Sequence, residues 1–508
     1  MSLEAALSIA SGGLANVNSQ LALVSHNVAN ADTPGYLVET ASQQSLTADG
    51  VGFGVLSGAA TRNLNVSLQE QVFQQGTTVA GLQTRQAALQ AIDAVQGTPG
   101  QGADLASLLG NLQNQFSSLQ DDPASQTQQS AVVASAATLA QGVNTLSNAY
   151  TTQRQAAENS IVSEVGTINA TLSTIGQLSN QIVAQQAAGL STADLENQRD
   201  SAVQGLAQII NVQTLVQPDG DMLVTTAGGL SLPTHGQSDP LSTSGANLQP
   251  GTYSPGGGVP AITLGGSDVT TQLTGGQLGA NITLRDSTMP TYQAELDEFS
   301  QHLASQFAAQ GLTLFTDPTG AVPAGGGSPV QAGYVGFAAI IQVNPQVQGD
   351  PSQVRDGNTT IAGNPTGASA FTPNPPNGPS GFTTLISRVL NYALGTNAQD
   401  GVPQPASNTT GLGADGTLNA PYVAPTTLGG LASTLVAAQA QDSANTSSQL
   451  STEQALQTTL TNTLAAGSGV NMDTEMSTMI QLQNAYGANA KIIAAVQAMW
   501  TQLIGAVQ

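Results

Sequence analysis

Apolar residues recur with a seven-residue period at both ends of the chain. At the N-terminal end they follow in alternating steps of four and three, which predicts a helix with one face made for burial, as in a coiled coil. This stripe comprises Leu3, Leu7, Ala10, Leu14, Val17, Leu21, Val24 and Val28. The C-terminal stripe comprises Met472, Met476, Met479, Tyr486, Ala490, Ile493, Trp500, Ile504 and Val507, with a second one beside it, Leu482, Val496, Met499 and Leu503. These ends can pack within one molecule, which composition alone favours, or against other copies.

Long helices are also expected in the interior of the chain. From residue 77 to about 210 the sequence is rich in Ala, Leu and Gln, and its apolar residues fall at helical spacing. The proline of Asp121-Asp122-Pro123 lacks a backbone donor and disfavours helix at the residue before it, so we expect a break there. Either Ser191 or Thr192 is suited to cap the next helix through its hydroxyl.

The period changes after residue 210. The segment NVQTLVQPDGDMLVTT alternates apolar and polar residues on either side of Pro218-Asp219-Gly220, which predicts a β-hairpin. Helix is expected again from Arg285 to Phe307, and the segment from Gly333 to Val343 is the best candidate for a further strand. The last helices are expected from about Leu428 onward, with a break at residues 465–471.

These patterns predict a mainly α fold with β-rich insertions. Terminal coiled-coil helices are expected at 1–40 and 470–508, around an elongated helical-bundle body formed by 41–210, 285–311 and 382–469. A β-rich insertion is expected at 211–284, and a β/loop-rich insertion at 312–381. The glycine-rich segment GVGFGVLSG, from residue 50 to 58, is better explained as a strand or turn than as a phosphate loop, because its glycine spacing is wrong for one.

The charge balance narrows the classes of partner. Only 8 Lys and Arg stand against 31 Asp and Glu, so nucleic acid is not an expected partner. With 8% charged residues, the surface must consist largely of amides and hydroxyls, which cost less to desolvate than charges and suit contacts between copies. The chain has no cysteine, no apolar run of membrane-spanning length and no basic N-terminal signal region. We expect no membrane partner and no cleaved signal peptide.

Candidate chemistry is sparse in the sequence. The three histidines, His26, His235 and His302, have no second metal ligand at helical spacing, and each is better explained as a surface or helix-face residue. No Gly-x-Ser-x-Gly elbow occurs, and the acidic residues are not paired with a base. We therefore expect no catalytic site, no bound metal and no cofactor.

The segment SHNVANADTPGY, from Ser25 to Tyr36, stops the first helix. Pro34 presets the second position of a turn and Gly35 accepts the positive φ of the third, so Thr33 to Tyr36 predict a type II turn. Asn30 is suited to end the preceding helix in the left-handed conformation. Helix stops of this kind occur in every class of protein, so this one alone indicates no function.

Taken together, the terminal motifs resemble those of the axial proteins of the bacterial flagellum. That group carries a motif of the type Asn-Asn-Ile-Ala-Asn-x-x-Thr-Pro-Gly-Tyr, which this chain matches with Asn27, Asn30, Thr33, Pro34, Gly35 and Tyr36, while His26 replaces the usual first Asn. The C-terminal segment from Gly469 to Val496 resembles the same group. Among the members of this group, the hook-associated protein 1 family has two further landmarks in the interior of the chain. The segment DLENQRD resembles the first, with Asp194, Leu195, Gln198, Arg199 and Asp200. The segment LRDSTMPTYQAELDEF resembles the second, with Arg285 and Asp286.

The resemblance implies a structural subunit that joins the flagellar hook to the filament. It implies that the terminal helices form the assembly interface, with Leu3, Leu7, Leu14, Val17, Leu21, Val24, Val28, Met476, Met479, Tyr486, Ile493, Trp500 and Ile504 on it. The implied partners are copies of the chain in a ring, the hook protein on one side, the second hook-associated protein on the other, and an export chaperone at the C-terminal helix. The implied location is extracellular, reached by type III export.

Two alternatives remain open from the sequence. Another axial subunit, such as the hook protein, would share the terminal motifs but should lack the two landmarks. A secreted adhesin or hydrolase would instead carry its activity in the central insertions, since loops on a rigid scaffold often hold function.

Overall fold

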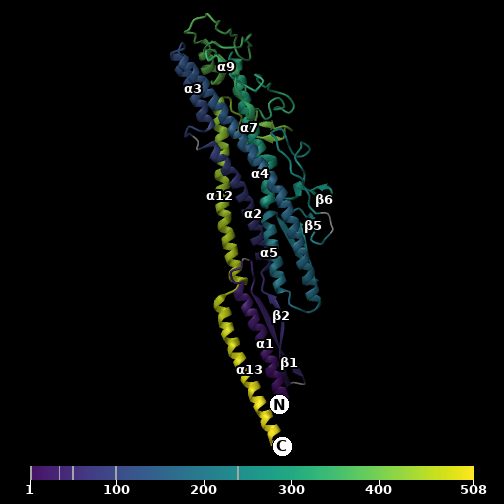
Figure 1. Ribbon diagram of the computed structural model, residues 1–508. Helices are drawn as coiled ribbons and strands as arrows, with labels where there is room; N and C mark the ends of the chain where they lie inside the picture. Colours follow the sequence, from purple (N-terminus) through teal and green to yellow (C-terminus); the bar gives the residue numbers. More distant parts are fainter. Residues whose placement is uncertain (1–2, 34, 49–50, 98–99, 237–239, 508) are drawn as a thin grey trace.

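The computed structural model describes residues 3–33, 35–48, 51–97, 100–236 and 240–507. The molecule is long and narrow, and both ends of the chain lie at the same tip (Figure 1). At this tip α1 (Leu3–Ala29) packs along α13 (Met472–Val507), and the antiparallel hairpin of β1 (Glu39–Ala48) and β2 (Val51–Arg62) packs against α1. The expected mainly α fold with small β-rich parts is confirmed.

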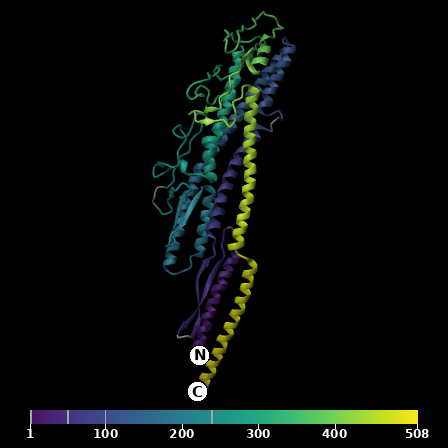
Figure 2. The ribbon, with the colours of Figure 1, turned by 180° about the vertical axis from the view of Figure 1, so that it is seen from behind.

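Long helices run along the body. Among them are α2 (Val66–Gln96), α3 (Leu105–Asp121), α4 (Gln126–Ala187), α7 (Met289–Ala309) and α12 (Leu428–Ser468). With 62 residues, α4 is about 93 Å long at the usual rise per residue. Figure 2 shows from behind that α12 runs alongside α2 and continues through a bend into α13. No helix of the described residues is long and apolar enough to cross a membrane.

Side-chain caps explain where four of these helices begin. Asn65, Asp104, Ser125 and Thr427 each precede a helix and accept a hydrogen bond from a backbone N–H of its first turn. The predicted break at Asp121–Pro123 is confirmed, because α3 ends at Asp121 and α4 begins at Gln126.

The helix α5 (Ala193–Ile209) begins where it was expected, but its cap differs. Thr192 occupies the N-cap position, yet its hydroxyl donates to Glu196 Oε1 at 2.7 Å and makes no capping hydrogen bond with the helix backbone. Capping by the Thr192 hydroxyl is therefore wrong, whereas Ser191, the other predicted residue, accepts a hydrogen bond from Ala193 N at 3.5 Å. An acidic residue in the first turn, Glu196, accepts the hydrogen bond of the Thr192 hydroxyl and also complements the positive end of the helix dipole.

The body contains two hydrophobic cores. The upper one is formed mainly by α3, α4, α7 and α12, and includes the fully buried rings of Phe116, Phe299 and Phe307. The lower one joins α4 and α5 to the three-stranded sheet of β3 (Val212–Val216), β4 (Met222–Thr226) and β5 (Ser231–Leu232). The predicted hairpin around Pro218–Gly220 is confirmed by the antiparallel pairing of β3 with β4.

The predicted strand from Gly333 to Val343 is wrong over most of its length. Its centre forms the helical turn α8 (Phe337–Ile340), and only β9 (Gln342–Val343) is extended, paired with β8 (Phe315–Thr316). Gly336, at φ +79°, bends the chain, and Asp297 accepts hydrogen bonds from Gly336 N at 2.7 Å and Ala338 N at 2.8 Å. A buried carboxylate on α7 thus caps a turn that apolar composition alone did not predict.

Helix also resumes earlier than the expected Arg285. The helix α6 (Gly276–Thr283) runs through a π-helical turn, η2 (Leu284–Thr288), into α7. It packs on α2 where two glycines meet, because a Cβ on Gly81 would lie only 3.0 Å from Gly276 O. The shorter elements are β6 (Thr263–Leu264), β7 (Ser267–Asp268), η1 (Thr270–Gln272), α9 (Pro345–Gly349), α10 (Gln353–Asp356), α11 (Thr384–Arg388), the π-helical η3 (Val389–Ala393), β10 (Asn397–Gln399), β11 (Val402–Pro403), β12 (Thr410–Leu412) and β13 (Leu418–Asn419).

Candidate assembly surface and its joint with the body

The terminal pair, α1 with α13, has a thin apolar seam. Val17 and Val24 of α1 are buried against α13, and Leu482 and Val496 are the buried apolar residues on the α13 side. Gly13 allows the helices to approach, since a Cβ there would lie 3.1 Å from Asn489 Oδ1. The other α1 residues predicted for the interface, Leu3, Leu7, Leu14, Leu21 and Val28, are half-buried. The seam therefore uses the predicted face of α1 and leaves part of its apolar area open.

On α13 the seam combines Leu482 and Val496 of the second apolar stripe with Met479 of the first, whereas Met499 and Leu503 of the second stripe are exposed. Of the residues predicted for the interface, Met479, Ile493 and Trp500 are half-buried, while Met476, Tyr486 and Ile504 are exposed. The exposed large apolar side chains of this helix are Met472, Met476, Ile480, Tyr486, Ile492, Met499, Leu503 and Ile504. At 100° per residue, Met476 and Ile480 lie on one side of the seam, and Ile492, Met499 and Leu503 lie on the other. The helix α13 thus presents open apolar surface on both flanks of its contact with α1.

The stop at the end of α1 is built around Asn27. This side chain is buried, and its amide donates to Glu39 O at 2.9 Å while its Oδ1 accepts from Glu39 N at 3.1 Å and from Tyr36 Oη at 2.9 Å. Asn27 therefore fixes the first residue of β1 to the last turn of α1. The sequence indicated Asn27 only as part of a motif, without this role.

The predicted turn after α1 is present in the residues that are described. Tyr36 N donates to Thr33 O at 3.1 Å, and Gly35 has a φ of +80°, as the third position of a type II turn requires. Pro34 lies outside the described residues. Asn30 caps α1 with its side chain, whose amide donates to His26 O at 3.1 Å.

The first landmark segment meets this turn from the body. On α5, Asn197 donates to Leu37 O at 3.2 Å, which binds the chain leaving the turn. Arg62, at the end of β2, donates to Asn197 Oδ1 at 3.0 Å, Asp200 Oδ2 at 2.8 Å and Glu196 Oε2 at 2.9 Å. The turn motif and DLENQRD, far apart in sequence, therefore form one polar joint between the terminal pair and the body.

The other landmark residues on α5 have different surroundings. Arg199 is buried and donates to Gly220 O at 2.7 Å, so it fastens the turn between β3 and β4. Asp194 and Gln198 are exposed and hydrogen-bonded to each other at 2.9 Å, and Leu195 is half-buried. Arg62 and Asn197 were not predicted for the joint. Arg62 is one of only 8 Lys and Arg in the chain, and its side chain is 7% exposed; charged side chains are seldom buried without a partner, which is the physical reason for its bonds to α5.

The joint also contacts the C-terminal helices. Val38 N donates to Ser468 O, at the end of α12, at 2.9 Å, and Asn27 reaches Glu475 on α13 at 3.4 Å. Burial raises the pKa of Glu39, an effect that nearby His26 and Asn197 oppose. Burial, together with the carboxylates of Glu39, Asp194 and Glu475, also holds the pKa of Tyr36 well above its ordinary range. The joint is thus tightly bonded and rich in acidic groups.

The second landmark lies in the interior of the body. Arg285, in η2, is fully buried and donates to Glu158 Oε2 at 2.8 Å, and the Glu158 side chain is itself fully buried. Its other nitrogens hold Asp286 in a bidentate pair, both at 2.8 Å. Arg154 adds a hydrogen bond to Arg285 O at 2.7 Å. This landmark is a buried ionic cluster that holds α4 to η2, away from the terminal helices.

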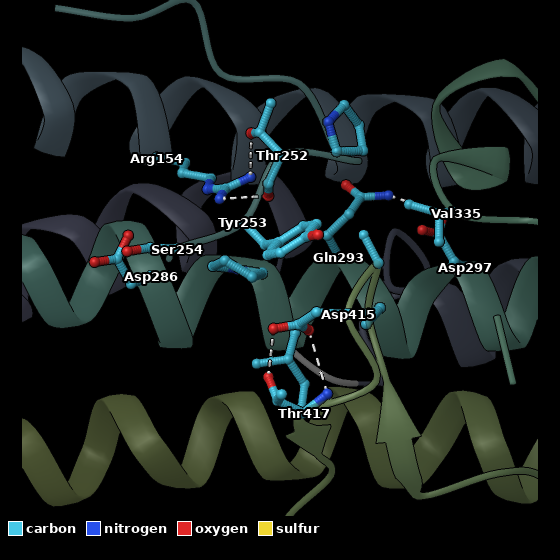
Figure 3. A pocket seen from close by; sticks show the side chains of 16 residues that line it. Arg154, Thr252, Tyr253, Ser254, Asp286, Gln293, Asp297, Val335, Asp415 and Thr417 are labelled. Carbon is cyan, nitrogen blue, oxygen red and sulfur yellow. Dashed lines mark hydrogen bonds between the residues drawn. The ribbon is translucent and has the colours of Figure 1, made fainter. Parts of the chain in front are cut away.

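A small cavity lies beside this cluster (Figure 3). Its volume is about 30 Å³, which is room for about one water molecule. The polar groups around it bond to one another: Arg154 donates to Thr252 O at 2.8 Å, and Thr417 donates to Asp415 Oδ2 at 2.9 Å. The cavity lining therefore serves to hold loops, and the space is too small for a substrate.

Three family models match the chain. The model of the flagellar hook-associated protein FlgK helical domain matches residues 89–321. The flagella basal body rod protein model matches residues 7–36, and the model of the flagellar basal body rod FlgEFG protein C-terminal region matches residues 464–506. The rod-type matches coincide with the terminal pair and the turn motif.

Curated relatives match a shorter part of the chain. Flagellar hook-associated protein 1 of Salmonella typhimurium is 30% identical over 236 residues, which are 44% of this chain and 41% of that protein. The protein of the same name in Bacillus subtilis is 23% identical over 235 residues, 44% of this chain and 46% of that protein. The chain therefore matches less than half the length of these relatives.

The fold is shared with a solved structure. The flagellar hook junction protein FlgK from Burkholderia pseudomallei matches with a TM-score of 0.54 and 17% sequence identity, over 78% of this chain and 99% of that one. At this identity the match concerns the fold. Taken with the family models and the relatives, it confirms the resemblance that the motifs predicted.

Proposed function

We propose that this chain, a relative of flagellar hook-associated protein 1, is a structural subunit that joins the hook of a bacterial flagellum to its filament. The observation that carries the proposal is the state of the terminal pair. The apolar seam between α1 and α13 is narrow, and large apolar side chains of α13 lie exposed on both sides of this seam. A helix with apolar flanks on both sides of one partner is suited to neighbours on both sides, as in a closed ring of copies.

The proposed mechanism couples ordering to assembly. Each flank buried between copies gains about 25 cal/mol per Å² of apolar area, which offsets an ordering cost of about 1 to 2 kcal/mol per residue. The joint at Asn27 and Asn197 then transmits the geometry of the assembled terminal helices to the body. The body, with its own cores, keeps its fold whether or not the terminal pair has neighbours.

The remaining partners follow from the same proposal. The subunit contacts copies of itself in a ring, the hook protein on one side and the second hook-associated protein on the other. An export chaperone covers the open apolar face of α13 before the chain leaves the cell through the flagellar type III exporter. The mature subunit is then extracellular. The subunit is proposed to be structural and not an enzyme, as the match to the hook-associated helical domain favours.

The alternative is a hook or rod subunit. The terminal segments fit it as well as they fit a junction subunit, because the two models that match them are of the rod type. The match of residues 89–321 to the hook-associated helical domain favours the junction over that alternative. The adhesin alternative has no comparable observation in its favour.

Deletion of the gene separates these roles. The junction role predicts completed hooks without filaments by electron microscopy, with filament subunits lost to the medium. Basal bodies without hooks would assign the chain to the hook or rod instead. Normal flagella would contradict a place in the axial structure altogether.

A further inference from the structure

Three side chains with metal-binding atoms meet at the joint from three different elements. His26 lies in the last turn of α1, Glu39 begins β1, and Asp194 lies in the first turn of α5. One such atom of each lies within 4.8 Å of the others. His26 Nε2 is 3.8 Å from Asp194 Oδ1, and His26 Nδ1 is 4.0 Å from Glu39 Oε2.

Glu39 is the buried member of this group, with 5% of its side chain exposed. Its Oε1 accepts a hydrogen bond from Asn197 at 3.2 Å, and its Oε2 is the oxygen that faces His26. The nearby guanidinium of Arg62 donates to Glu196, Asn197 and Asp200 instead. A buried carboxylate is costly unless it is paired or bound to a cation, so the group has a physical need for further positive charge.

We propose that His26, Glu39 and Asp194 form a binding site for one divalent transition-metal ion of the zinc type. One imidazole with two carboxylates suits Zn²⁺ and its neighbours, whereas Mg²⁺ and Ca²⁺ prefer ligand sets made of oxygen alone. A tetrahedral ion with bonds near 2.1 Å holds its ligand atoms roughly 3.4 Å apart. Small rotations bring the three donors to that spacing, because His26 and Asp194 have 41% and 52% of their side chains exposed.

The surroundings also orient the ring. Tyr36 Oη lies 3.1 Å from His26 Nδ1 and holds the ring as the second nitrogen of a metal-ligating histidine is held, so that Nε2, which faces Asp194 Oδ1, binds the ion. The Glu39 carboxylate, whose Oε2 is 4.0 Å from Nδ1, must shift toward Nε2 to bind the same ion. Gln198 donates to Asp194 Oδ2 at 2.9 Å, so the other oxygen, Oδ1, is the one directed to His26. Water from the exposed side supplies the fourth ligand. A bound ion links the end of α1 directly to α5, across the joint.

Ligand spacing in the sequence could not reveal this group, because its members stand at positions 26, 39 and 194. The proposed metal site goes beyond a role in the flagellar axis. It is tested on the soluble chain, so the result is independent of assembly. The full chain is treated with a chelator, dialysed, and titrated with ZnCl₂ by calorimetry. A parallel titration with CoCl₂ follows the visible bands of a low-symmetry cobalt site.

The site predicts saturation at one Zn²⁺ per chain and weaker binding by tenfold or more in both His26→Asn and Asp194→Asn. Asp194 is exposed, so its variant retains the fold, which circular dichroism verifies. The control is His235→Asn, which removes the other exposed histidine near an acid, with His235 Nε2 at 3.3 Å from Asp221 Oδ1. This variant is expected to bind Zn²⁺ as the unchanged chain does.

Three results would overturn the proposal. The first is no saturable heat of Zn²⁺ binding to the unchanged chain. The second is binding of several ions with equal affinity in the Asp194→Asn and unchanged chains, which means general attraction to an acidic protein. The third is loss of binding in His235→Asn alone, which places the ion elsewhere.

Discussion

The body and the terminal pair are both built from long helices, but they bury their apolar residues to very different extents. In the body, Phe116, Phe299 and Phe307 are fully enclosed by several helices. On α13, Ile492 and Leu503 remain 47% and 53% exposed, although they have the same apolar character. The difference shows that a periodic apolar stripe does not by itself specify a complete core. The hydrophobic cores of the body are closed within one chain, whereas the terminal pair leaves part of its apolar surface uncovered.

The buried charges show the same contrast. The body encloses a fully buried ion pair, Arg285 with Glu158. The exposed surface of α13 instead carries large apolar side chains and only two charged ones, Asp473 and Lys491, among the described residues. Buried charges require fixed partners, so they suit a region that folds once and stays folded. Apolar side chains on the flanks of α13 can be covered later by another copy of the chain, because their desolvation costs little free energy.

The largest effect is expected from breaking the buried ion pair. Arg285→Met leaves Glu158 without its cation in the interior, and we expect the free energy of unfolding of the body to fall by about 3 to 5 kcal/mol. Urea denaturation followed by circular dichroism measures the change. The control is Arg355→Met, which removes a more exposed pair with Asp356 and should cost less than about 1 kcal/mol. Equal losses in the two variants would contradict the role given to the buried cluster.

Leucine truncations compare the two regions directly. Leu112→Ala opens a cavity in the upper core and should lower the unfolding free energy of the body by about 2 to 5 kcal/mol. Leu482→Ala, made in the seam of the terminal pair, should leave the main unfolding transition unchanged and speed hydrogen exchange only in α1 and α13. A shift of the main transition by Leu482→Ala comparable to that of Leu112→Ala would mean that the seam belongs to the core of the body.

Two buried carboxyl groups of the body predict that its stability depends on pH. Burial raises the pKa of Glu295 from 4.5 to about 8, and that of Asp297 to about 7. Between the ordinary and the raised value the folded chain holds a proton that the unfolded chain has released. The free energy of unfolding should therefore fall as pH rises from about 4.5 to about 8 for Glu295 and from about 3.8 to about 7 for Asp297, by at most about 1.4 kcal/mol per pH unit for each group.

Glu295→Gln removes the contribution of that carboxyl and should flatten the pH profile. Urea midpoints between pH 4.5 and pH 8 measure it, with Glu70→Gln, on the exposed face of α2, as the matched control. An unchanged slope in Glu295→Gln would show that this carboxyl does not retain its proton in the folded chain.

The smallest effect on stability is expected on the open flank of α13. Leu503→Asp should change the unfolding free energy by no more than about 0.5 kcal/mol, since the side chain is already exposed. It should nevertheless prevent incorporation into flagella, because it places a charge in the proposed contact between copies. Gln502→Asp, about 100° away around the helix, is the control and should allow motility. Motile cells with Leu503→Asp would remove this flank from the contact.

The sequence predicted those features that depend on local order. The terminal helices, the break at Asp121–Pro123 and the hairpin at Pro218–Gly220 follow from periodicity and turn residues within a few positions. The sequence did not predict which residues of α13 face α1, because two neighbouring stripes are both apolar and the pattern gives no preference between them.

Features that depend on distant residues could not be predicted. The turn α8 replaced an expected strand because Asp297, on another helix, caps it. The joint unites Asn27, Arg62 and Asn197, which are polar residues with no pattern of their own. The landmark segments indicated that α5 and η2 matter, but only the fold showed that one serves the joint and the other the interior.

Hydrogen exchange of the soluble chain, before and after assembly, tests the central claim most directly. The account predicts that amides of Leu3–Ala29 and Met472–Val507 exchange roughly a hundredfold faster than those in the middle of α4 in the monomer, and become protected on assembly. Equal, strong protection of both regions in the monomer would contradict it, and would mean that the terminal pair is complete without neighbours.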